Sequence, residues 1–425
     1  MLNQLIEETT IYSLKKIINH SMNKSLNIQF LDDVTIHHVD KEKSYLLYIH
    51  VPFCHTFCPF CSFHKFKYDQ KISEDYFRSL RLEMRKVKNE GFSFHTLYVG
   101  GGTTLINEKE LIKTLELAKK LFDIKDISCE SDPNHIAAHS LKSFKGLIDR
   151  LSIGIQSFDD TILKRIHRYD KFGSAKILQE KIASMQGILP STSLDLIFNF
   201  PTQTNEMLVK DLDIAKSLGV EQITTYPLMS SGLTKDRMSK AFDAQQNSSE
   251  YNFYNTIKEN LGDYHQNNAW SFSKQKAEMS DEYVTNHNEY IGIGSGAFSY
   301  INNNLYINAF DLDKYSDLVL KRPNAIVANS TFSFQKRLQY HFLTWLFSGS
   351  IDIEKFNYAF GTNLLSSLNK EMFMLKKVNA IFIKEGKIHT TNFGQYLCLI
   401  MMKEFYSGMD RIRAMFKQEY LKIAV

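Results

Sequence analysis

From about residue 45 the sequence alternates short runs of β-branched and aromatic residues with longer stretches of helical periodicity. This alternation is typical of repeated strand–helix units, which fold into a parallel sheet covered by helices. Six strands are predicted, at residues 45–51, 96–99, 126–130, 150–155, 193–198 and 222–226. The sequence therefore indicates an α/β fold, a partial (β/α)6 TIM-like barrel.

The pattern changes after about residue 240, where polar, Asn-rich connections replace the strand–helix rhythm. Helices are expected at residues 73–89 and 108–122 in the barrel and at 333–346 and 393–407 beyond it, the last two flanking a β-ribbon at 380–389. We predict three regions: an N-terminal helical arm at 1–44 with an amphipathic helix at 4–18, the barrel at 45–240, and a mostly helical C-terminal accessory domain at 241–425.

Composition excludes several classes of protein. The 425 residues carry a formal net charge of only +4, without the dense Lys/Arg run expected of a nucleic-acid-binding surface. The N-terminus lacks the basic start and apolar core of a secretory signal, and no apolar run approaches the ~18 residues of a membrane span. We therefore expect a cytoplasmic protein with no nucleic-acid partner and no membrane span.

Three cysteines fall within eight residues, at Cys54, Cys58 and Cys61, and no fourth lies nearby. Iron–sulfur clusters are normally held by four thiolates, so a 4Fe-4S cluster bound by three would leave one iron open. The amino and carboxylate groups of S-adenosylmethionine are the ligand that this spacing suggests. Zinc is the alternative, with His55 or His64 as fourth ligand, whereas five cysteines in so long a chain do not suit a disulfide framework.

Polar and glycine-rich motifs follow the predicted strands one after another. Cys54 comes after the first strand, residues 100–104 follow the second, Glu130 ends the third, Gln156 follows the fourth and Asp195 lies within the fifth. Functional residues of parallel barrels gather at the carboxyl ends of the strands, so these residues are expected to meet.

The chemistry of these residues suits an amino-acid-like ligand. The glycines at 100–102 would let backbone amides approach a charged group, and the alternative is a tight turn after a strand. The hydroxyl of Thr103 and the position after a barrel strand favour the ligand. Glu130 and Asp195 can accept hydrogen bonds from an ammonium or from ribose hydroxyls, or form an ordinary salt bridge at the barrel rim.

Several ordered motifs together resemble a known family. They are Tyr48-Ile-His-Val-Pro-Phe-Cys54, Tyr98-Val-Gly-Gly-Gly-Thr103, Cys129-Glu-Ser-Asp-Pro133, Arg150-Leu-Ser-Ile-Gly-Ile-Gln-Ser-Phe158, Asp195-Leu-Ile-Phe-Asn-Phe-Pro-Thr-Gln-Thr204 and Tyr290-Ile-Gly-Ile-Gly-Ser-Gly-Ala-Phe-Ser299. The chain resembles the radical S-adenosylmethionine (SAM) superfamily, and more narrowly its oxygen-independent coproporphyrinogen III oxidase-like family. That family includes haem chaperone and haem-degrading methyltransferase branches.

The resemblance implies a set of site residues but assigns no catalytic residue. Cys54, Cys58 and Cys61 would hold a 4Fe-4S cluster. One or two molecules of S-adenosylmethionine would contact Tyr48, Phe60, Gly101, Gly102, Thr103, Glu130, Gln156, Arg168, Asp195, Met229 and Phe298. Considered without the resemblance, Arg168 would be interpreted as a solvent-exposed charge, and the aromatic residues as part of the hydrophobic core. The glycines at 292–296 are not a dinucleotide fingerprint, because no long helix follows them.

The implied function is a radical SAM enzyme that forms a 5'-deoxyadenosyl radical and acts on a tetrapyrrole, most simply by oxidative decarboxylation of propionates in coproporphyrinogen III. An electron donor such as flavodoxin or ferredoxin would serve it. A haem-degrading or other radical methyltransferase, an enzyme for another small molecule, and a haem chaperone without net turnover remain alternatives.

Three residues depart from the family pattern. Phe63 stands where the oxidase has a further cysteine, and Phe298 stands where the chaperone branch usually has histidine. Asn199 replaces a glycine, a mild change because Asn tolerates left-handed backbone angles.

Overall fold

The computed structural model describes residues 27–32, 34, 36, 39–40, 43–229, 234–243, 249–276 and 287–423. The predicted helix at 4–18 lies outside these residues. Within them, no helix is both long and apolar enough to cross a membrane.

One large sheet organises the described residues, with the strand order β1-β15-β14-β13-β12-β2-β5-β6-β7-β8-β9-β11-β10. Its strands are β1 (Gln29–Phe30), β2 (Ser44–Val51), β5 (Ser93–Gly101), β6 (Asp126–Ser131), β7 (Arg150–Gln156), β8 (Ser191–Phe198), β9 (Gln222–Pro227), β10 (His265–Gln266), β11 (Ser271–Ser273), β12 (Tyr290–Ile293), β13 (Phe298–Ile301), β14 (Asn304–Asn308) and β15 (Ile326–Thr331). Strands β12, β2 and β5 to β9 run parallel, and antiparallel strands extend both edges.

All six predicted barrel strands are present as β2 and β5 to β9, with ends within three residues of the prediction. They are almost continuously buried, as expected of parallel strands covered by helices. The predicted α/β fold class is confirmed. One parallel strand was not predicted: β12 pairs with β2 although more than two hundred residues separate them. The large sheet therefore includes residues beyond position 240.

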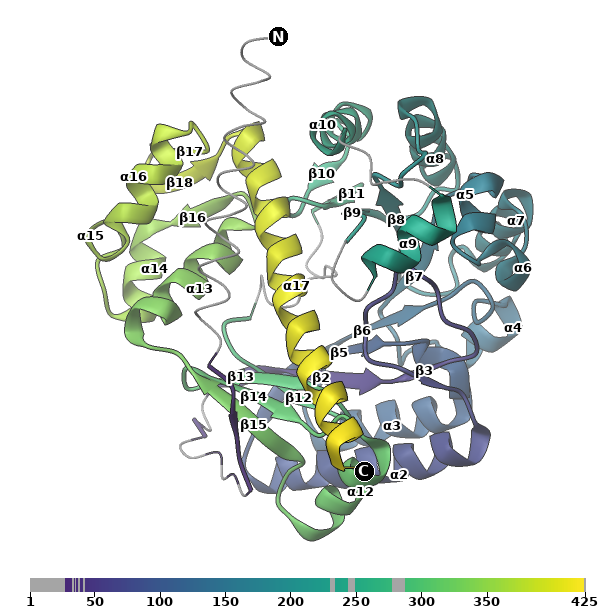
Figure 1. Cartoon of the computed structure of the whole chain (residues 1–425), viewed down its shortest axis with the longest axis vertical. Helices are drawn as coiled ribbons and strands as arrows, with labels where there is room; N and C mark the ends of the chain where they lie inside the picture. Colours follow the sequence, from purple (N-terminus) through teal and green to yellow (C-terminus); the bar gives the residue numbers. More distant parts are fainter. Residues whose placement is uncertain are drawn as a thin grey trace.

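Helices surround the sheet, and most of them lie between successive barrel strands (Figure 1). They are α2 (Gln70–Asn89), α3 (Glu108–Leu121), α4 (Ala138–Leu141), α5 (Asp160–Arg165), α6 (Tyr169–Phe172), α7 (Ala175–Met185), α8 (Asn205–Ser217), α9 (Lys235–Phe242), α10 (Glu250–Asn260) and α12 (Leu312–Lys321), with 3-10 turns at η1 (Thr104–Asn107) and η2 (Lys142–Phe144). The predicted start of the first helix at residue 73 was three residues late, because the side chain of Asp69 accepts the Ile72 N–H and caps the helix there.

The C-terminal region is largely helical, as predicted, around a small three-stranded sheet. Its elements are α13 (Phe334–Leu346), β16 (Ser350–Asp352), α14 (Ile353–Phe360), α15 (Leu364–Ser367), α16 (Asn369–Lys377), β17 (Ile381–Lys384), β18 (Lys387–Thr390) and α17 (Asn392–Ile423). The pair β17 and β18 is the predicted ribbon. Helix α17 is much longer than the predicted 393–407 and runs from this small sheet across the open face of the barrel (Figure 1).

Glu250 fastens α17 to the barrel. This buried carboxylate pairs with Lys403, accepts the Tyr396 hydroxyl at 3.1 Å and accepts the side-chain amide of Asn199 at 3.2 Å. Asn199 itself has a φ of 69°, the left-handed conformation that its replacement of glycine was expected to tolerate. A departure from the family pattern therefore doubles as an anchor for the C-terminal helix.

Replacing Glu250 with alanine should destabilise the protein by about 3 kcal/mol, because it leaves the partly buried Lys403 without its counter-ion and removes the acceptor of two further hydrogen bonds. Urea unfolding followed by circular dichroism measures this. Glu259→Ala, on the exposed face of the same helix, is the matched control and should change little. Equal stability of the Glu250 variant and the control would contradict the anchoring role.

Candidate functional site

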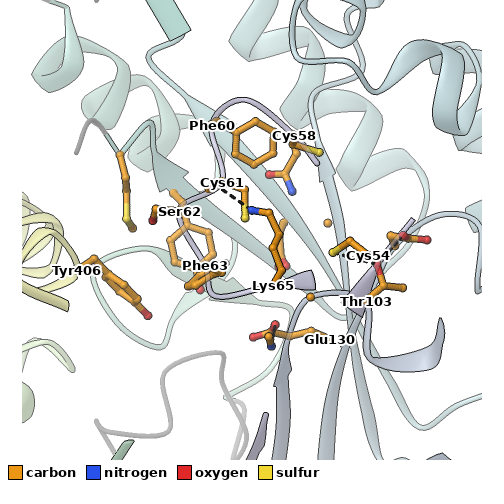
Figure 2. A pocket seen from close by; sticks show the side chains of 18 of the residues that line it. Cys54, Cys58, Phe60, Cys61, Ser62, Phe63, Lys65, Thr103, Glu130 and Tyr406 are labelled. Atoms are coloured by element: carbon orange, nitrogen blue, oxygen red, sulfur yellow. Dashed lines mark hydrogen bonds between the residues drawn. The ribbon is translucent and has the colours of Figure 1, made fainter. Parts of the chain in front are cut away.

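A cavity of about 300 Å³ opens where the parallel strands end. Every residue predicted to bind the cluster or S-adenosylmethionine lines it: Tyr48, Cys54, Cys58, Phe60, Cys61, Gly101, Gly102, Thr103, Glu130, Gln156, Arg168, Asp195, Met229 and Phe298. Figure 2 shows Cys58, Phe60 and Cys61 on one side of this space, and Cys54 beside Thr103 with Glu130 nearby on the other. The structure thus brings together side chains that are as much as 250 positions apart in sequence.

The cysteine loop is built by two short strands, β3 (Phe53–Cys54) and β4 (Phe66–Lys67), which pair in parallel. All three cysteines are free thiols. Burial and the neighbouring Cys61 raise the pKa of Cys54 to about 11, so this thiol needs a positive centre to ionise near neutral pH. The donor set of three thiols facing one cavity fits a 4Fe-4S cluster with one iron left open, since iron supplies that positive charge.

Neither His55 nor His64 is placed to be the fourth ligand of a zinc ion. His64 is buried, with Nε2 3.0 Å from the Ser295 hydroxyl, and its ring packs edge-on against Phe310. His55 stacks on His135, and neither His55 nor His64 lines the cavity. In the described part of the chain, no three His, Cys, Asp or Glu side chains are grouped closely enough to hold a single metal ion.

The glycine run packs directly on the cysteine loop. Gly102 N–H donates to Val51 O and Thr103 N–H to Phe53 O, each at 2.8 Å. A Cβ on Gly102 would lie 2.4 Å from Phe53 O and 3.0 Å from Cys54 Sγ, so no other residue fits. The N–H groups of Gly102 and Thr103 already donate within the protein, and the contact of the glycine run with a ligand stays a prediction. Glycine at position 102 is needed for the close approach of two backbones.

Two carboxylates lie at or near the carboxyl ends of their strands, Glu130 in β6 and Asp195 within β8. Glu130 accepts the Tyr98 hydroxyl at 2.8 Å and the Gly101 N–H at 3.1 Å, which fixes its orientation. Asp195 Oδ1 accepts the Ser152 hydroxyl at 2.7 Å. Each carboxylate has four lone-pair positions, so both can also accept bonds from an ammonium or from ribose hydroxyls in the cavity.

Arg168 places a buried guanidinium beside the cysteines. It donates to Gly154 O, approaches Cys58 Sγ at 3.7 Å and lies over the Phe172 ring at 4.3 Å. Only 5% of the residue is exposed, yet its Nε–H has no partner in the described structure. An orphaned N–H of this kind suits the carboxylate of S-adenosylmethionine, since such groups are rarely left unpaired.

Gln156 ends β7 with a φ of 75°, an uncommon conformation for a residue other than glycine. The next residues are held by Asp211 of α8, which accepts the Ser157 hydroxyl at 2.7 Å and the Phe158 N–H at 2.6 Å. Burial raises the pKa of Asp211 to about 7, and these two hydrogen bonds offset part of that rise. The carboxylate that supports Gln156 is therefore sensitive to pH.

Asp211 should make stability depend on pH. Its pKa is higher in the folded protein than in the unfolded chain, where it is near 3.8, so its contribution to the free energy of unfolding falls as the pH rises through this window. Urea midpoints at about pH 5 and about pH 8 should fall more steeply in the native protein than in Asp211→Asn. Asp213→Asn, exposed on the same helix, should behave like the native protein. Parallel curves for native protein and Asp211→Asn would contradict the assignment.

The glycine-rich segment after β12 also reaches the cavity. Because β12 runs parallel to β2, its carboxyl end lies at the same edge of the sheet as the cysteine loop. A turn and β13 follow, with no helix, so the dinucleotide interpretation is excluded here. Gly296 and Phe298 line the cavity from this side, and Met229 lines it from the segment after β9.

Sequence reasoning missed several residues that line the cavity. His50 and Tyr98 lay inside quoted motifs, and alternation along β2 would have placed His50 on the same face as Tyr48. Burial, together with the nearby Arg413 charge, lowers the pKa of His50 to about 4, so its ring is neutral at pH 7. Tyr406, Met409 and Arg413 were missed because nothing in the sequence shows where α17 lies.

The chain is similar to several known proteins. Residues 48–215 match the Radical SAM superfamily. The heme chaperone HemW of Bacillus subtilis is 25% identical over 365 residues, which cover 82% of this chain and 96% of the relative. The oxygen-independent coproporphyrinogen III oxidase of Helicobacter pylori is 33% identical over 196 residues, 42% of this chain and 41% of the relative.

A solved structure shares the fold. The coproporphyrinogen III oxidase HemN of Escherichia coli superposes with a TM-score of 0.72 at 21% identity, covering 85% of this chain and 90% of that one. Residues 48–215 of the chain therefore form a radical SAM domain. Within the superfamily, the chain is a homologue of proteins named heme chaperone HemW and oxygen-independent coproporphyrinogen III oxidase.

Cys58→Ser should abolish the visible absorbance and most of the iron and sulfide of anaerobically reconstituted protein, because two thiolates cannot retain the cluster. Cys398→Ala is the matched control. Cys398 of α17 is buried, donates to Leu346 O of α13 and does not line the cavity. Iron and acid-labile sulfide analysis decides the question. A fully loaded Cys58 variant would refute the ligand assignment.

Proposed function

We propose that this protein is a radical SAM enzyme that acts on a tetrapyrrole. The observation that carries the proposal is the convergence of three free thiols, two carboxylates at or near strand ends and a buried arginine on one cavity. Oxidative decarboxylation of a propionate to a vinyl group is the reaction that we place first. It removes carbon dioxide and two hydrogen atoms per propionate.

The protein's own residues would bind and orient the reactants. Cys54, Cys58 and Cys61 would hold the cluster, and Arg168 would pair with the carboxylate of S-adenosylmethionine. Glu130 and Asp195 would accept hydrogen bonds from its ammonium and ribose groups. When bound, the reduced cluster and S-adenosylmethionine supply the means to remove a hydrogen atom from an unactivated carbon. A flavodoxin or ferredoxin would deliver the electron, as proposed from the resemblance.

The walls of the cavity would keep water away from the reacting carbon. Phe60, Phe298 and Met229 present apolar surface beside the cysteines, and α17 covers the opening. Exclusion of water limits side reactions and holds reacting groups in a fixed arrangement. The neutral His50 hydrogen-bonds to the Tyr48 hydroxyl at 2.9 Å, which orients both side chains at the base of the cavity.

Haem transport without turnover is the second candidate. It is favoured by the length of the match to the heme chaperone HemW, which spans 96% of that protein, against 41% of the oxidase. Phe63 supports it too, since the oxidase pattern has cysteine at this position. Methylation and opening of haem is the third candidate within the same chemical class.

Anaerobic incubation with dithionite, S-adenosylmethionine and either coproporphyrinogen III or haem separates the three candidates. We expect a product of coproporphyrinogen III lighter by carbon dioxide and two hydrogen atoms, identified by mass spectrometry, and none from Cys58→Ser. A methylated, ring-opened haem product would replace this proposal with degradation. Tight haem binding with neither product would replace it with the chaperone function.

A further inference from the structure

The cavity lining contains two arginines in the described part of the chain, Arg168 and Arg413, and one cofactor carboxylate accounts for only one of them. Different elements hold the two side chains. Arg168 follows α5 and is fixed at the end of β7, whereas Arg413 comes from α17. The second guanidinium therefore needs its own explanation.

Arg413 is buried but incompletely paired. Its residue is 8% exposed, and one terminal nitrogen donates to Asp410 Oδ1 at 2.6 Å, one turn earlier on the same helix. Its Nε–H has no hydrogen-bond partner in the described structure. Burying an N–H without an acceptor costs folding free energy that a ligand oxygen could recover.

Two aromatic rings lie beside Arg413. The guanidinium lies 5.4 Å from the centre of the Phe63 ring, and the Tyr406 ring meets Phe63 edge-on at 6.4 Å. Figure 2 shows Tyr406 reaching from α17 toward Phe63. Met409 lines the same wall, and Phe63 remains 41% exposed. An exposed aromatic surface beside a charged fork suits a ligand that combines a flat apolar ring with an anionic substituent.

The position of α17 is fixed well enough for recognition. Glu250 holds its first half, and near its end the Phe416 ring stacks on Phe310 at 4.8 Å and 26°. Phe310 also packs against His64 of the cysteine loop and against Phe298 of β13. Arg413 lies between these two anchors, so it is presented to the cavity by a helix secured on both sides.

We propose that Arg413 binds a carboxylate of the substrate while Phe63 and Tyr406 pack against its ring, so that α17 determines which tetrapyrroles enter. The inference rests on the proposed function in taking a tetrapyrrole as the substrate class. The guanidinium fork matches the two oxygens of a carboxylate, and the Phe63 ring lies within cation–π distance of it. Arg413 is a binding residue in this scheme and takes no part in bond breaking.

Fluorescence titration with protoporphyrin IX and its dimethyl ester tests the carboxylate directly, because the ester keeps the ring and removes both charges. The native protein should bind the diacid about 10- to 100-fold more tightly than the diester. Arg413→Met should lose most of this preference by weakening diacid binding alone, and Arg413→Lys should fall between because it keeps the charge without the fork. Equal affinity of the native protein for the two porphyrins would overturn the proposal.

Arg411→Met is the matched control, since Arg411 lies on the same helix and does not line the cavity, and it should preserve the native preference. An Arg413→Met variant with unchanged preference would overturn the assignment to this residue. If that variant does not fold, Arg413→Lys and the native diacid-to-diester ratio still decide. Formation of 5'-deoxyadenosine by the native protein, measured on the same preparation, separates this proposal from the proposed function. Selective binding of the diacid without 5'-deoxyadenosine would contradict only the proposed enzyme activity. Formation of 5'-deoxyadenosine without selective binding would contradict only the proposed Arg413 site.

Discussion

The contact between the glycine run and the cysteine loop is the constraint on which the site depends. Parallel pairing of β2 with β5 sets the ends of these strands side by side, and the N–H groups of Gly102 and Thr103 then bond to carbonyls in the segment that leads to Cys54. Because a single Cβ at Gly102 would collide with both Phe53 O and Cys54 Sγ, the first cysteine is positioned by the sheet itself. Cys58 and Cys61 follow in a loop closed by β3 and β4.

The site is completed by parts of the chain that lie far from the barrel in sequence. Strand β12 adds a parallel neighbour to β2 and brings the glycine-rich segment and Phe298 to the same edge. Helix α17 then covers the opening, held by Glu250 at one end and by the stacking of Phe416 on Phe310 at the other. The cofactor side of the cavity is thus built by the barrel, and its outer wall by the C-terminal region.

Features set by local interactions could be predicted from the sequence, and features set by long-range contacts could not. The barrel strands were predicted within three residues because hydrophobic runs and intervening helices are local signals, and the strand-end residues converge because parallel strands share an edge. The place of α17 depends on contacts such as Lys403 with Glu250, which join residues more than 150 positions apart and leave no local trace. Arg413 was missed for this reason. Nor could the sequence show that Val51 O and Phe53 O already accept the N–H groups of Gly102 and Thr103.

The central claim is that three thiolates of this cavity hold a cluster whose open iron binds S-adenosylmethionine. The most direct measurement is the yield of 5'-deoxyadenosine and methionine after anaerobic reduction of reconstituted protein, alongside its iron and acid-labile sulfide content. The account predicts sulfide-containing protein that releases both products in equal amounts. Protein that contains zinc without sulfide, or that carries the cluster yet leaves S-adenosylmethionine intact under reduction, would contradict it.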